Sequence, residues 1–210
     1  AERIARSIGI EDTDLIWLCG MLHDIGRFEQ VRRYVTFSDA ASVDHASFGA
    51  DLLFKEGLLD SFCEPDEKER ELLELAIRSH SLYRLPDGLS EEETAVCNIL
   101  RDADKVDIFR VNVETPTEDI YNVSTYELKH SLISPEVKQC FLDRHAVLRS
   151  LKKTPADFIV GHACLTFELV YPKSREEANE QGFVDRLISF ESEEEETRKF
   201  FEYMRANIWG

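Results

Sequence analysis

An apolar stretch that ends in a histidine and an aspartate constrains the fold of this chain more than any other segment. Drawn as a helix, the residues from Leu15 to Leu22 are apolar on nearly every side. Such a helix is buried almost all round, so it carries the adjacent His23 and Asp24 into the interior. Burying either group without a partner costs several kcal/mol. The pair therefore needs protein partners or a metal ion, and for an isolated His-Asp pair a structural role is the commoner explanation.

Helix signals continue along the whole chain. Caps, capping boxes and prolines at a first turn mark the starts of further helices, namely at Asp44, Pro65-Asp66, Ser90 with Glu93, Ser134-Pro135 and Thr154-Pro155. No repeat, low-complexity linker or change of composition marks a second domain. The sequence predicts an all-α fold and one domain over residues 1–210. In this domain, metal-site helices span about 12–112 and C-terminal helices over about 134–208 complete the bundle.

Glycines and one polar stretch predict where helices end. Gly26 is expected to end the first buried helix, and Gln30–Val43 is expected to be an irregular connection. Gly49 follows His45 by four positions and shares its helix face. A glycine inside a helix costs roughly 1 kcal/mol relative to alanine. We therefore expect a ligand or another backbone segment to approach His45 at Gly49.

Composition excludes several classes of partner. The chain has 210 residues, and 42 acidic against 25 basic residues give a net charge of -17, which repels the phosphates of long nucleic acids. No apolar run approaches the roughly 20 residues that a membrane span requires. The five cysteines are widely spaced without a CxxC pair. They are typical of reduced thiols in a cytoplasmic protein.

Four successive predicted helices carry groups that bind metals. Besides His23-Asp24, these are His45, His80 and Asp104. Each residue has a structural explanation when taken alone, such as a helix-end histidine that stabilises the dipole. Together, three imidazoles and two carboxylates suit one or two ions of Fe, Mn, Zn, Co or Ni better than Ca or Mg. His145 and His162 are expected to be packed or surface histidines.

The order of these motifs resembles that of the HD-domain metal-dependent phosphohydrolases. HDIGR at 23–27, a histidine after an aspartate, a histidine that closes a helix, and RDADK at 101–105 carry the resemblance. It covers about Leu15 to Phe109, and it implies an all-α, HD-domain or phosphodiesterase-like helical bundle.

The resemblance assigns metal-binding roles residue by residue. It implies that His23, Asp24 and Asp104 bind one metal ion and that His45 and His80 add ligands for a second. Asp102 is then expected to orient a ligand. The family pattern begins with a further metal-binding histidine, and we expect it upstream of Ala1, because Ala1–Ile8 resembles the end of a longer helix.

The chemistry implied is attack on phosphorus by a water molecule that the metal activates. Asp24 and Arg27 are the predicted catalytic residues, and Arg27, Lys105 and Arg84 are the predicted contacts of substrate phosphate. A structural ion pair explains Arg27 equally well, and it is the favoured explanation of Lys105 and Arg84.

The leading hypothesis is a cytoplasmic phosphohydrolase that acts on a nucleotide or another small phosphate ester. Two alternatives use the same ligands: a di-iron oxygenase of the same fold, and a non-catalytic regulatory module whose metal is structural. The sequence indicates neither a membrane nor a long nucleic acid as partner, and it leaves the oligomeric state open.

Overall fold

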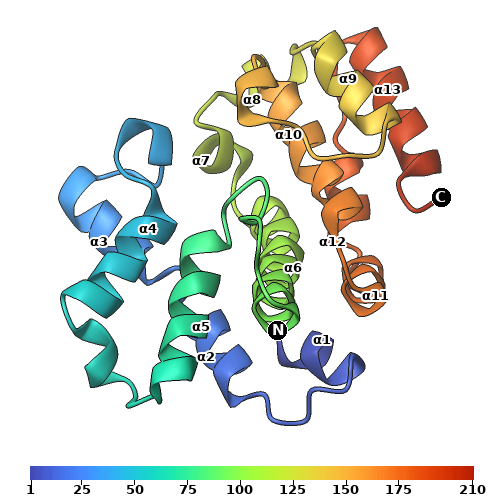
Figure 1. Cartoon of the computed structure of the whole chain (residues 1–210). Coiled ribbons are helices and arrows are strands. Elements are labelled where there is room, and N and C mark those ends of the chain that lie inside the picture. The colour runs from blue at the N-terminus through green and yellow to red at the C-terminus, as the bar shows by residue number, and fades with distance from the viewer. The chain divides into compact units, whose positions relative to one another are not determined.

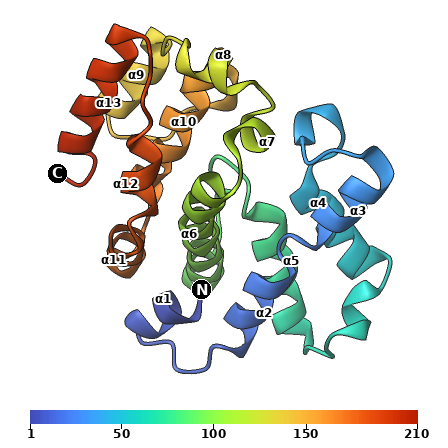
Figure 2. The same cartoon turned by 180° about the vertical axis from the view of Figure 1, so that it is seen from behind.

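The computed structural model describes all residues, 1–210, as α-helices joined by turns and short 3₁₀ or π segments, with no β-strand (Figures 1 and 2). The predicted all-α fold class is confirmed. Contacts within the chain divide it into two compact units, Ala1–Asp104 and Lys105–Gly210. The single domain expected over 1–210 stays a prediction. None of the helices combines the length and the apolar composition that would let it cross a bilayer.

The first unit is built from the N-terminal helices. In both views α2 lies beside α5 and α3 beside α4, and these pairs are in contact, as are α4 and α5 (Figures 1 and 2). Both α2 and α5 contribute completely buried apolar side chains to this unit, such as Cys19 and Ile77. The helices are α1 (Glu2–Ser7), α2 (Asp14–Leu22), α3 (Ile25–Tyr34), α4 (His45–Ala50), α5 (Glu67–Ser79) and α6 (Glu91–Glu114). The connecting 3₁₀ turns are Asp39–Ala41 and Leu58–Ser61, and a π turn, Asp51–Lys55, continues α4.

Caps set the starts of these helices, as the sequence predicts. The Asp44 carboxylate accepts a hydrogen bond from the backbone N–H of Ser47 at 2.8 Å and begins α4. Asp66 with Glu69 forms a capping box at α5. Ser90 and Glu93 exchange the equivalent bonds before α6. Each cap satisfies N–H groups that a helix start leaves without a partner.

The prediction that Gly26 ends a helix is wrong. α2 ends at Leu22, and Gly26 lies in the first turn of α3, which runs through Gln30 to Tyr34. A Cβ atom on Gly26 would lie 2.3 Å from the carbonyl oxygen of His45 and 2.7 Å from the nitrogen of Gly49. Gly26 and Gly49 therefore let the backbones of α3 and α4 touch, which confirms the expected approach of another backbone near His45.

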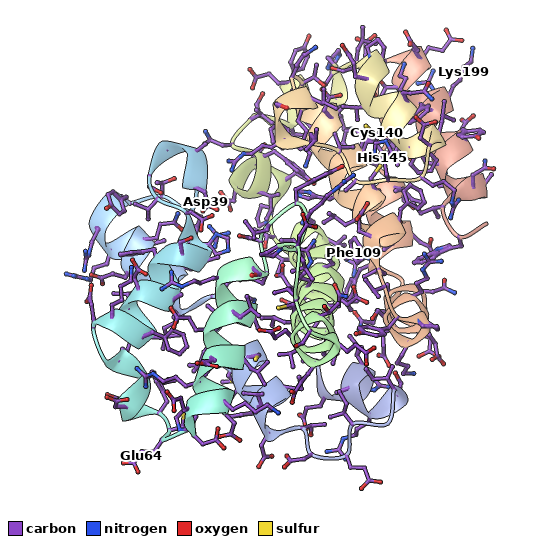
Figure 3. The ribbon with its side chains drawn as sticks, viewed as in Figure 1. Asp39, Glu64, Phe109, Cys140, His145 and Lys199 are labelled. Carbon is purple, nitrogen blue, oxygen red and sulfur yellow. The ribbon has the colours of Figure 1, made fainter.

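The second unit has a core of its own. Phe109, Leu128 and Met204 are almost completely buried in it, and Figure 3 marks Phe109 and Cys140. Asp157, also buried, accepts hydrogen bonds from the N–H and the hydroxyl of Ser134, so one carboxylate joins the starts of α9 and α10. All five cysteines are free thiols. The helices are α7 (Thr117–Tyr121), α8 (Thr125–Lys129), α9 (Pro135–Leu142), α10 (Pro155–Ala163), α11 (Pro172–Gln181), α12 (Phe183–Ile188) and α13 (Glu195–Asn207), with 3₁₀ turns at Arg149–Leu151 and Cys164–Glu168.

Candidate metal centre

His23 and Asp24 occupy the turn between α2 and α3. His23 is the C-terminal cap of α2, and its backbone N–H bonds to the carbonyl of Cys19. Its ring Nδ1 lies 2.8 Å from the carbonyl oxygen of Gly20. Asp24 precedes α3 as its N-cap residue, and its side chain makes no capping bond. The carboxylate of Asp24 is therefore not used to begin the helix.

The other two predicted histidines lie at helix ends of the same unit. His80 caps the C-terminus of α5, with Nδ1 2.7 Å from the carbonyl oxygen of Ile77. His45 is the first residue of α4, with Nδ1 2.7 Å from Oδ2 of Asp39. Carbonyl and carboxylate oxygens only accept hydrogen bonds. In all three histidines Nδ1 therefore carries a proton, which leaves Nε2 as the nitrogen that can bind a metal ion.

The Nε2 atoms of the three histidines face one small region. The Nε2 atoms of His45 and His80 lie 3.0 Å apart, and the rings of His23 and His80 meet edge to face with centroids 5.0 Å apart. Two lone pairs at that distance repel unless a proton or a cation lies between them. Nitrogen ligands at about 2.1 Å from one metal ion are about 3.0–3.4 Å from each other, depending on the coordination geometry. The observed separation fits a shared metal ion.

Asp24 lies between the histidines with one oxygen toward each side. Its Oδ2 is 3.7 Å from Nε2 of His23, whereas its Oδ1 is 3.4 Å from Nε2 of His45 and 3.8 Å from Nε2 of His80. Oδ1 is buried and has no hydrogen-bond partner. A buried carboxylate oxygen without a donor is costly, and a cation would compensate it.

The cluster thus has two halves that share Asp24. The first half-site consists of His23, Oδ2 of Asp24 and Asp104, whose Oδ1 is 3.6 Å from Nε2 of His23. The second half-site consists of His45, His80 and Oδ1 of Asp24. Each half-site combines imidazole nitrogen with carboxylate oxygen, and Asp24 contributes one oxygen to each. All five predicted metal ligands are brought together by the fold.

Electrostatics differ between the histidines. Burial lowers the pKa of His23, but the carboxylates of Asp104 and Asp24 outweigh burial and raise this pKa to about 8. For His80, burial prevails over the attraction of Asp104, and with the nearby His23 and His45 it holds the pKa below its ordinary value. His80 is therefore neutral near pH 7, the form in which an imidazole binds metals.

Two further aspartates lie near His45, and hydrogen bonds explain their positions without a metal ion. Asp39, Asp44 and His45 place ligand atoms within 4.8 Å of one another. However, Asp39 accepts the Nδ1 proton of His45, and Asp44 caps α4 through the N–H of Ser47. Hydrogen bonds account for all three side chains.

Two residues that hold the site were not singled out in the sequence. Arg101, almost buried on α6, donates to the carbonyl oxygens of Ser79 and Tyr83 at 3.1 and 3.3 Å and so holds the segment that contains His80. Its position four residues after the buried Cys97 is the signal that points to an inward arginine. Asp39, the partner of His45, has no such signal, because it lies in a predicted irregular connection.

The remaining predicted residues lie as follows. Arg27 donates through Nη1 to Asp39, at 2.8 Å, and its Nε is 3.6 Å from Oδ1 of Asp24. Asp102 is completely buried on α6. Arg84 is exposed with its guanidinium over the ring of Tyr83, and Lys105 is half-buried on α6. The roles given to Arg27, Asp102, Arg84 and Lys105 stay predictions.

Comparison with known proteins identifies the family to which this chain belongs. The family model described as HD domain matches residues 1–108, just over half of the chain, and this range contains the whole cluster. Neither curated proteins nor solved structures gave a significant match. The predicted resemblance is confirmed: the chain belongs to the HD domain family, a superfamily of metal-dependent hydrolases.

Proposed function

We propose that this protein is a metal-dependent phosphohydrolase that acts on a nucleotide or another small phosphate ester. One observation carries the proposal. The Nε2 atoms of three imidazoles lie around the two oxygens of Asp24, and one of these oxygens is buried without a donor. A divalent cation would satisfy both the imidazole nitrogens and the carboxylate at once.

The donor atoms favour a first-row transition metal. Each half-site combines imidazole nitrogen with carboxylate oxygen, which suits Fe, Mn, Zn, Co or Ni. We propose two such ions, one for each half-site. When bound, these ions lower the pKa of a water molecule and neutralise phosphoryl oxygens.

Different residues of the chain would hold the metal ions and orient the substrate. Asp24 presents one oxygen to each half-site, so it would help to hold both ions. Arg27 is anchored through Nη1 to Asp39, to the carbonyl of Phe37 and to Gln30. None of these bonds uses Nη2 of Arg27, and we propose that this nitrogen contacts a phosphoryl oxygen of the substrate. Lys105 and Arg84 are proposed as further phosphate contacts.

The charge of the chain limits the substrate. A net charge of -17 repels a polyanion, whereas cations inside one site can attract a single phosphate group. We propose a small substrate and, since all five thiols are free, a cytoplasmic location.

The test is ester hydrolysis by protein reconstituted in turn with Mn²⁺, Fe²⁺, Co²⁺ and Zn²⁺. Substrates are p-nitrophenyl phosphate, bis-p-nitrophenyl phosphate and a panel of nucleotides, with released product as readout. We expect activity that a chelator abolishes and that falls at least about 100-fold in Asp24→Asn, since a bridging ligand is lost. Circular dichroism checks that the variant is folded.

Metal-loaded protein that hydrolyses none of these esters contradicts the proposal. Oxygen consumption by the iron-loaded sample would then favour an oxygenase. Unfolding of His45→Ala and Asp104→Ala, in place of folded inactive protein, would favour a structural metal.

A further inference from the structure

Asp39 makes one of the shortest contacts around the cluster, although it is not one of the five candidate ligands. It begins the 3₁₀ turn in the connection between α3 and α4, where Figure 3 labels it. Its Oδ2 accepts the Nδ1 proton of His45 at 2.7 Å. Its Oδ1 accepts from Nη1 of Arg27 at 2.8 Å and from Nε2 of Gln30 at 3.0 Å. Both oxygens are thus occupied by donors.

Asp39 is held by a buried amide. Gln30 is completely buried on α3, and its Nε2 also lies 3.0 Å from both the hydroxyl of Ser42 and the carbonyl of Val43. The hydroxyl of Ser42 in turn donates to the carbonyl of Ser38. This network ties the 3₁₀ turn to α3 on both sides of Asp39, so the carboxylate cannot turn away from His45 without breaking several bonds.

The bond from Asp39 to Nδ1 also determines whether the other ring nitrogen of His45, Nε2, carries a proton. A neutral imidazole has one ring proton, which can sit on either nitrogen. Nδ1 of His80 is committed to the carbonyl of Ile77, so Nε2 of His80 can only accept. If the proton of His45 moved to Nε2, it would bond to Nε2 of His80, only 3.0 Å away. That hydrogen bond would occupy both nitrogen ligands of the second half-site.

We propose that Asp39 is the positioning residue that keeps the second half-site open to metal. It holds the proton of His45 on Nδ1, away from His80, and its negative charge makes Nε2 a better ligand. This inference rests on the binuclear site of the proposed function. It is selective, because His23 of the first half-site is oriented by the carbonyl of Gly20 and has no contact with Asp39.

The experiment is titration of the metal-free full chain with Zn²⁺ and with Co²⁺, followed by calorimetry and Co²⁺ absorption. We expect two ions for the wild type. In Asp39→Ala the affinity for one ion falls about 10- to 100-fold and the other is unchanged. Asp39→Asn, which keeps an acceptor without the charge, has an intermediate effect. Thermal unfolding of both variants checks their folding.

Asp44→Asn is the matched control. Asp44 is in the same connection and close to His45, but its bond goes to the backbone of Ser47, and asparagine caps a helix equally well. We expect wild-type affinity for both ions. If Asp44→Asn weakens the same ion as Asp39→Ala, the two aspartates are ligands of an ion at Nδ1 of His45, and the positioning role is wrong.

Nitrogen NMR of ¹⁵N-histidine-labelled, metal-free protein identifies the tautomer of His45 and requires no activity assay. We expect a protonated Nδ1 of His45 in the wild type and a protonated Nε2 in a large fraction of Asp39→Ala. Wild-type affinity for both ions in Asp39→Ala overturns the inference and leaves the proposed function intact. A wild type that binds fewer than two ions contradicts the binuclear site itself, and the inference fails with it.

Discussion

At the scale of single residues, the chemistry of the cluster depends on the proton that each imidazole carries on Nδ1. Carbonyl oxygens of Gly20 and Ile77 and the carboxylate of Asp39 fix those protons. The lone pairs of His45 and His80 then face each other and Asp24. These three hydrogen-bond acceptors therefore orient the rings so that their Nε2 atoms and the carboxylate of Asp24 share one region, which a cation would stabilise.

His80→Ala tests the division into half-sites. It removes a ligand from the second half-site only, so we expect one bound ion in place of two, with the remaining ion bound as in the wild type. Elemental analysis of the folded variant measures this. Loss of both ions would mean that the halves do not bind independently.

A second residue-scale prediction concerns His162 in the other unit. Its ring stacks on Tyr121. Burial, with the nearby Lys152, lowers the pKa of His162 to about 3. The unfolded chain therefore binds this proton more readily below about pH 6.5, and stability is lost as the pH falls.

Urea unfolding at pH 7 and pH 5 measures the effect. We expect the wild type to lose about 2 kcal/mol from this group over that range, whereas His162→Gln lacks that loss. Equal losses in the two proteins would show that His162 is protonated in the folded state as easily as in the unfolded state.

At the scale of elements, the site depends on how closely α3 approaches α4. The sequence predicted His23, Asp24, His45, His80 and Asp104 as candidate metal ligands because polar groups at the ends of apolar helices are unusual. It did not predict that α3 begins at Ile25, because glycine signals both a helix stop and a close backbone contact. It also did not predict Asp39, because a side chain in an irregular connection is placed by tertiary contacts and not by periodicity.

Gly26→Ala tests this contact. The added methyl group would overlap the backbone of His45 and Gly49, so we expect the free energy of unfolding to fall by about 1–3 kcal/mol. Gly20→Ala is the control on α2, where the nearest atom, Cβ of Ala1, is 3.7 Å away. There we expect no loss or a gain of up to about 1 kcal/mol. Equal effects of the two substitutions in urea unfolding would contradict the close contact.

At the scale of the whole molecule, α6 links the two units. It runs unbroken from Glu91 to Glu114, and the boundary between Asp104 and Lys105 lies inside it. Asp104 at this boundary is a candidate ligand. Because α6 is continuous across this boundary, unfolding of the second unit would fray the helix that carries Asp104.

We therefore expect a single cooperative transition in scanning calorimetry of the metal-free chain, with equal calorimetric and van't Hoff enthalpies. Metal addition should raise the midpoint of that one transition. Two separate transitions, of which only one responds to metal, would show that the units fold as independent domains.

Elemental analysis of the purified protein beside Asp24→Asn tests the proposed two-ion site most directly. We expect close to two transition-metal ions per chain in the wild type and a large loss in the folded variant, because Asp24 contributes an oxygen to each half-site. A folded wild type that binds no metal, even after reconstitution, would contradict the proposed metal site.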